Sequence, residues 1–199
     1  YENPIDRNLI TEIWDQGTMF LGVRYQPLNA SSTILDNAET VGNYSASGDA
    51  GTPVADTVTF KEGNGSIKIP ITNSSGSATI STTFSSALNL STYKKRYYFV
   101  WVYLDAVPTS IELRLRSSAG NYLSSGALTA QFSGQALKAD DWNLLAFDLN
   151  IATQTGTFAS ANISAQDIIL TAAATGTYFI DAAYLREWDL LDYWFYSKL

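Results

Sequence analysis

The stretch YYFVWVYL, residues 97–104, decides the fold. It consists of aromatic and aliphatic residues that favour strands, and along a strand successive side chains point to opposite faces. One face would carry an ordinary core, and the other a continuous aromatic stripe of Tyr97, Phe99, Trp101 and Tyr103. Because four neighbouring rings are costly to leave in water, we expect the stripe either to be covered or to bind a ligand.

Further short runs of strand-forming residues lie on both sides of this stretch, separated by Gly, Ser and Asn turns. The predicted strands cover residues 58–60, 66–71, 78–84, 111–116, 142–149, 167–171 and 178–185. Residues 66–71 and 111–116 alternate polar and apolar side chains, which is typical of half-buried strands. Many short strands without a helical period predict an all-β fold, an antiparallel β-sandwich with Greek-key connections, or jelly roll.

The two ends of the chain differ from this body. In residues 1–30 a helix is predicted to start near Pro4 or Asp6 and to end at Gly17, followed by a strand over residues 19–25. Residues 187–199 form an aromatic tail. We therefore predict an N-terminal extension over 1–30, the jelly roll over 31–186 and a connecting segment over 187–199. The chain starts with Tyr1, so we expect a processed product or an excerpt of a longer chain.

Composition excludes several classes of function. The 199 residues carry a net charge of −7, which argues against nucleic acid as a partner, and no apolar run is long enough to span a membrane. The chain contains neither Cys nor His, so Ser–His and Cys–His catalysis are excluded, together with the commonest ligands of transition metals. A bound metal would have to be an ion that prefers oxygen ligands, such as Ca²⁺.

Two interpretations of the aromatic stripe remain open. If the strand at 111–116 pairs with the strand at 97–104, Arg114 and Arg116 would lie beside Trp101 and Tyr103 and could stack on them. Rings beside planar hydrogen-bonding groups suit a sugar, whose C–H faces pack on rings. The alternative, which we favour, is that the terminal segments or another subunit cover the stripe. Those segments carry aromatic residues of their own, namely Trp14, Phe20, Tyr25, Trp188, Tyr193, Trp194, Phe195 and Tyr196.

Five pieces of the body occur in the order found in a known family. They are KEGNGSIKI at 61–69, FVWVYL at 99–104, ELRLRSS at 112–118 followed by NYL at 121–123, DWNLLAFDL at 141–149, and YFIDAAYL at 178–185. Over about residues 34–186 the chain resembles the carbohydrate-binding-module-like (galactose-binding-like) jelly rolls, including versions in bacteriophage virion proteins. With Tyr122 in the third of these pieces, the candidate ligand-binding residues are Trp101, Tyr103, Arg114, Arg116 and Tyr122.

The resemblance also implies a structural calcium site. Its candidate ligands are Asp36, Glu39, Glu62 and Asp181. In the family the closing strand usually has two acids in a row, whereas here Asp181 is followed by Ala182. The alternative is that Asp181 accepts hydrogen bonds from backbone amides at a corner of the sheet.

No catalytic constellation is visible among the acidic residues, because most of them lie at turns or strand ends. Glu112 lies within a strand, and we expect it to form an ion pair with Arg114 or Arg116. The favoured hypothesis is a non-catalytic structural domain of a virion or surface assembly, of phage origin, oligomeric and partnered by other virion subunits or domains. The alternative is a glycan-binding module or adhesin, and a fragment of a glycan-active enzyme is a distant third.

Overall fold

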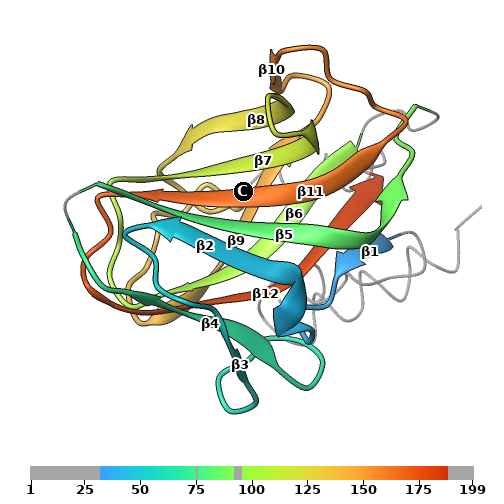
Figure 1. Ribbon diagram of the computed structural model, residues 1–199. Helices are drawn as coiled ribbons and strands as arrows, with labels where there is room; N and C mark the ends of the chain where they lie inside the picture. Colours follow the sequence, from blue (N-terminus) through green and yellow to red (C-terminus); the bar gives the residue numbers. More distant parts are fainter. Residues whose placement is uncertain (1–31, 75, 92–95, 188–199) are drawn as a thin grey trace, which may run out of the picture. The chain divides into compact units, whose positions relative to one another are not determined.

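The computed structural model describes residues 32–74, 76–91 and 96–187, which form two packed antiparallel sheets (Figure 1). Sheet A has the order β3-β4-β12-β6-β9, with β1 also pairing with β12, and sheet B has the order β10-β8-β7-β11-β5-β2. The strands of sheet A are β1 (Ser32–Asp36), β3 (Val54–Asp56), β4 (Ser66–Ile71), β6 (Arg96–Leu104), β9 (Asp141–Asp148) and β12 (Gly176–Glu187). The strands of sheet B are β2 (Tyr44–Gly48), β5 (Ser77–Leu88), β7 (Ser110–Ser118), β8 (Asn121–Leu128), β10 (Thr153–Thr155) and β11 (Ile163–Thr171).

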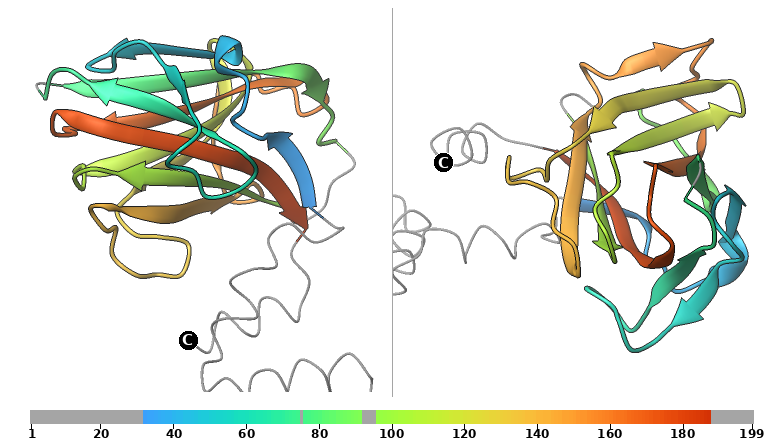
Figure 2. Two further views of the ribbon diagram at one scale, coloured as in Figure 1. Left: turned by 90° about the horizontal axis from the view of Figure 1, so that it is seen from below. Right: turned by 90° about the vertical axis from the view of Figure 1, so that its left-hand side faces the viewer.

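The strand predicted from residues 97–104 is β6, and it lies inside sheet A between β12 and β9 (Figure 2). Its inward side chains, Tyr98, Val100, Val102 and Leu104, are almost completely buried. They pack against the inward side chains of sheet B, among them Ile111, Leu113 and Leu115 of β7. Burying a side chain of this size contributes roughly 1.5–3 kcal/mol relative to its exposed state, so this layer is the main source of stability.

A small polar network lies within this core. The hydroxyl of Tyr98 donates to Oε1 of Gln166 at 2.6 Å, and Nε2 of Gln166 donates to the hydroxyl of Thr82 at 3.3 Å. The bonds join β6 of sheet A to β11 and β5 of sheet B. Since a buried polar group is costly without a partner, they favour one alignment of the sheets.

One predicted strand is wrong. Residues 58–60 form a loop, because the carboxylate of Asp56 accepts hydrogen bonds from the backbone N–H groups of Val58 and Thr59, at 3.0 and 2.6 Å. This local turn replaces the ladder hydrogen bonds that a strand would need. The other strands predicted after residue 31 are present, with bounds that differ by a few residues.

Helical structure in the described part of the chain is limited to the single 3₁₀ turn η1 (Val41–Asn43). Among these residues there is no helix of the length and apolar character required to cross a bilayer. The predicted helix and strand before residue 31 and the aromatic tail after residue 187 lie outside the described residues, and the proposed domain boundaries remain predictions.

Candidate functional site

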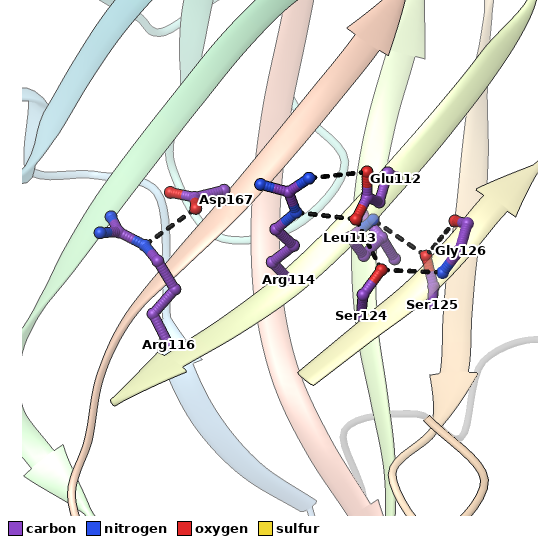
Figure 3. Close-up of polar contacts among 8 residues, drawn as sticks. All are labelled: Glu112, Leu113, Arg114, Arg116, Ser124, Ser125, Gly126 and Asp167. Atoms are coloured by element: carbon purple, nitrogen blue, oxygen red, sulfur yellow. Dashed lines mark hydrogen bonds and ion pairs between the residues drawn. The ribbon is translucent and has the colours of Figure 1, made fainter. Parts of the chain in front are cut away.

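The outer face of sheet B is a polar surface built by strand alternation. The inward residues of β7 are apolar, so Glu112, Arg114 and Arg116 point outward. Register places them beside outward residues of the neighbouring strands (Figure 3). Rows of small hydroxyl side chains continue the face onto β5, β2 and β10, namely Ser45, Ser47, Thr79, Ser81, Thr83, Thr153 and Thr155.

Arg114 is fixed in place by Glu112. Its Nε and Nη2 donate to the two carboxylate oxygens of Glu112, at 2.7 and 3.0 Å. The hydroxyl of Ser124 on β8 donates to the same carboxylate at 2.6 Å. Burial alone would raise the pKa of Glu112, but the bonds from Arg114 and Ser124 outweigh it and lower the pKa. The predicted ion pair of Glu112 is therefore confirmed, with Arg114 as the partner.

Arg116 pairs instead with Asp167 of β11. The Nε of Arg116 lies 2.8 Å from one carboxylate oxygen of Asp167, and the hydroxyl of Ser81 donates to the other oxygen at 2.6 Å. The exposed fractions of the two charged side chains are 21% and 9%. This pair is therefore more shielded from water than an ordinary surface ion pair.

Tyr122 of β8 adds an aromatic ring to this polar surface. The guanidinium carbon of Arg114 lies 4.4 Å from the centroid of the Tyr122 ring. Arg114 is paired with Ser124 and Arg116 with Tyr122, so Arg114 and Tyr122 are diagonal neighbours on one face of the β7–β8 pair. The result is two planar cations, two carboxylates, a hydroxyl and a ring in one partly exposed patch. We call it the sheet B patch, and it consists of Glu112, Arg114, Arg116, Tyr122, Ser124 and Asp167.

The predicted ligand set is therefore divided between two faces. Arg114, Arg116 and Tyr122 lie on sheet B, whereas Trp101 and Tyr103 lie on the outer face of sheet A. The condition for bringing them together, pairing of the strands at 97–104 and 111–116, is not met, because β6 pairs with β12 and β9, and β7 pairs with β11 and β8. The connection at residues 105–109 carries the chain from one sheet to the other, so the arginines do not lie beside the stripe.

Trp101 is not an open ring. Its side chain is only 7% exposed, its Nε1 donates to Oε1 of Glu62 at 2.7 Å, and Nζ of Lys61 lies 4.9 Å from the ring centroid. Farther along the stripe, Phe99 stacks on Tyr184 of β12 with centroids 5.3 Å apart. Phe132, from the loop between β8 and β9, meets Phe99 edge-on at 4.9 Å. The terminal segments predicted to cover the stripe lie outside the described residues.

The four predicted calcium ligands take part in other contacts. Asp181 is fully buried, and it accepts the backbone N–H groups of Lys61, Glu62 and Ala182 at 2.6, 2.8 and 2.6 Å. This is the alternative expected at the corner of the sheet, and it does not suit a cation, because the three N–H hydrogens point at the oxygens. Burial raises the pKa of Asp181, and hydrogen bonds from the three amides offset part of that rise.

The remaining acids are also engaged. The hydroxyl of Tyr44 donates to Asp36, and the backbone N–H of Asn64 donates to Glu39 at 3.0 Å. Gly63 has a φ of +68°, a left-handed backbone conformation that favours glycine at this turn. Within residues 32–187, apart from the undescribed gaps, no group of three or more acidic side chains is placed to hold a metal ion. The predicted calcium site does not fit this arrangement, and calcium binding stays a prediction.

Sequence reasoning missed Asp167 and Ser124. Both enter the patch through strand pairing, and Asp167 lies 51 or more positions from the residues of β7 beside it. The sequence did contain a signal, because Asp167 is a charged residue directly before the apolar run IIL at residues 168–170. A carboxylate in a central strand requires a partner, and an arginine of the adjacent strand is the natural one.

No protein-family model and no curated protein matches this sequence. Solved structures do share its fold. The family 30 carbohydrate-binding module of a cellulosomal cellulase of Clostridium thermocellum matches with a TM-score of 0.59 at 12% identity, over 79% of this chain and 98% of that one. A family 11 carbohydrate-binding module of the same organism, in complex with a β-1,3-1,4-mixed-linked tetrasaccharide, matches with a TM-score of 0.54 at 13% identity, over 78% of this chain and 95% of that one.

At these identities the likeness shows the fold alone. The chain has the β-sandwich of the jelly-roll kind seen in carbohydrate-binding modules, so the fold class and this part of the resemblance are confirmed. The virion context, an oligomeric state, the subunit partners and a virion or extracellular location stay predictions.

Proposed function

We propose that this domain is a non-catalytic carbohydrate-binding module and that a polysaccharide binds across the sheet B patch. The observation that carries the proposal is the fixed arrangement of Arg114, Glu112 and Tyr122 on a fold shared with carbohydrate-binding modules. A sugar offers hydroxyl groups to planar hydrogen-bonding partners and C–H faces to rings. Both kinds of partner are present here, so the alternative from the sequence is preferred over the virion role.

Preorganisation supports this function. Arg114 and Arg116 are each held by a carboxylate, so binding a sugar costs little additional side-chain entropy. At the partly exposed edges of these two ion pairs, carboxylate lone pairs and guanidinium N–H groups that are not used within the pair can form hydrogen bonds with the hydroxyl groups of a sugar. The shallow rows of Ser and Thr beside the patch leave room for an extended chain. This geometry suits a neutral polysaccharide lying along a face.

The test is affinity electrophoresis in gels that contain mixed-linkage β-1,3-1,4-glucan, β-1,3-glucan or xylan. We expect at least one polysaccharide to retard the wild-type chain. Tyr122→Ala removes the ring, and Arg114→Lys keeps the charge but loses the planar fork. Each should weaken binding by about ten-fold or more, a difference of about 1.4 kcal/mol.

Phe60→Ala is the matched control, because Phe60 is an exposed aromatic residue (41%) outside both sheets. Its mobility should equal that of the wild type. If no glucan or xylan retards the wild type, or if Tyr122→Ala and Arg114→Lys bind as the wild type does, the sheet B patch is not a glycan site.

A further inference from the structure

A row of three rings crosses the outer face of sheet A beyond the closed part of the stripe. Register places Trp142 of β9 beside Tyr103 of β6, and Tyr103 beside Phe179 of β12. The ring centroids are 5.7 Å and 5.5 Å apart, with interplanar angles of 73° and 85°. Since adjacent strands lie about 4.8 Å apart, the row extends about 10 Å across three strands, comparable to two linked sugar rings.

The exposure of the side chains distinguishes this row from the other residues of the stripe. Trp142 and Tyr103 are half-buried, whereas Phe179 is only 8% exposed and supports the edge of Tyr103. Trp101, by contrast, is closed by Lys61 and Glu62. The outer face of sheet A thus has a closed aromatic end and a partly open one, and the open rings are fixed by packing on each other.

Carboxylates lie around the open end. Asp105 accepts the backbone N–H of Thr177 at 3.0 Å, and Asp141 accepts that of Trp142 at 2.8 Å. Asp140 has a φ of +53°, and its N–H donates to the carbonyl of Leu104 at 2.7 Å. Desolvation raises the pKa of Tyr103, and the charges of Asp140, Asp105 and Asp141 raise it further, so its hydroxyl remains a hydrogen-bond donor.

We propose that Trp142 and Tyr103, bordered by Asp105, Asp140 and Asp141, form a second carbohydrate-contact surface on the face of the sandwich opposite the sheet B patch. An apolar protein partner would have to desolvate the three carboxylates without replacing their hydrogen bonds. A sugar instead packs its C–H face on the rings and donates its hydroxyls to the acids. The ligand class rests on the proposed function, whereas the location does not.

Two contact surfaces on opposite faces would let one domain hold two polysaccharide strands, or two parts of one strand. Binding would then gain from the high effective concentration of the second contact. The domain would also cross-link soluble polysaccharide, which a module with one surface cannot do as a monomer.

The experiment compares the wild type with Trp142→Ala, Tyr122→Ala and the double variant by affinity electrophoresis in mixed-linkage β-1,3-1,4-glucan. Each single variant should be retarded less than the wild type, with an apparent affinity about ten-fold or more weaker, and the double variant should not be retarded. Trp142→Phe keeps a ring and should restore most of the retardation. In the Tyr122→Ala background, the indole N–H signal of Trp142, assigned by its loss in Trp142→Phe, should still shift when the mixed-linked tetrasaccharide is added.

The outcomes separate the two proposals. If Tyr122→Ala alone abolishes retardation and the Trp142 signal does not move, the second surface is overturned and the proposed function stands. If Trp142→Ala abolishes retardation and Tyr122→Ala has no effect, the second surface stands and the sheet B patch is overturned. Equal melting temperatures of Trp142→Ala and Trp142→Phe show that a loss of binding does not result from a loss of folding. Asp140→Asn tests the acidic rim of the surface without removing a ring.

Discussion

Removing the carboxylate of Asp181 should destabilise the domain by an amount that its contacts allow us to estimate. Asp181→Ala leaves three backbone N–H groups without their acceptor. Ala182 is 6% exposed, so its N–H stays unpaired, at a cost of about 1–3 kcal/mol. Lys61 and Glu62 are more accessible, and water can replace Asp181 there at a net loss of about 0.5–1.5 kcal/mol each.

One effect acts in the opposite direction. Burial raises the pKa of Asp181, which means that the folded state bears a desolvation cost that the variant no longer has. The expected net loss is therefore about 2–4 kcal/mol in the free energy of unfolding. For a chain of this size, 1 kcal/mol corresponds to about 2–4 °C, so the melting temperature should fall by about 4–16 °C. Asp181→Asn keeps one acceptor oxygen and should fall between the wild type and Asp181→Ala.

Thermal unfolding followed by circular dichroism is the assay, and Asp49→Ala is the matched control. Asp49 also accepts a backbone N–H, that of Gly76 at 2.6 Å, but on the exposed surface. Its loss should cost about 0.5–1 kcal/mol, because water replaces the carboxylate. A melting temperature of Asp181→Ala equal to that of Asp49→Ala would refute the reasoning, since the burial of the amide network would then have no energetic consequence.

Two further predictions concern the same corner of the sheet. Burial raises the pKa of Glu62, so the folded state binds more protons than the unfolded state between the ordinary and the raised pKa. The stability advantage of the wild type over Glu62→Gln should therefore be greatest in acid and should decrease as the pH rises from the ordinary pKa through the raised one, whereas a pH-independent difference would contradict it. For calcium, we expect equal melting temperatures in EDTA and in added Ca²⁺, because the oxygens of Asp181 already accept N–H groups; a higher melting temperature in Ca²⁺ would show that the corner rearranges into the site that the family resemblance implied.

The sequence predicted which side of each main strand faces the core, because alternation is a local property. Leu113 and Val102 are buried as the pattern requires, and Arg114 is on the opposite face from Leu113. The partner of each strand is not local. The strands at 97–104 and 111–116 follow one another along the chain, yet the sandwich places them in different sheets, so the expected contact between arginines and aromatic rings could not form.

The candidate site was predictable only in part for the same reason. Arg114, Arg116 and Tyr122 lie on adjacent strands of one hairpin, β7 and β8, so their proximity follows from residues that are near one another in the chain. Asp167 reaches Arg116 through β11, a strand whose pairing follows from packing the whole sheet. The different environments of Trp101 and Tyr103, two residues apart on one face, depend on a turn about 40 positions earlier and a strand about 80 positions later.

Asp181 links that difference to the stability of the domain. The register of β12 with β6 places Asp181 directly beside Trp101, and the register shifts only after this pair, between Asp181 and Ala183. The carboxylate holds the backbone of Lys61 and Glu62, and the side chains of those two residues close the ring of Trp101. Lys61 and Glu62 do not extend over Tyr103 and Trp142, whose rings therefore stay partly exposed. It follows that Asp181→Ala, which destabilises this corner, should also expose Trp101. The exposed row of Trp142 and Tyr103 would then become longer and would not be lost.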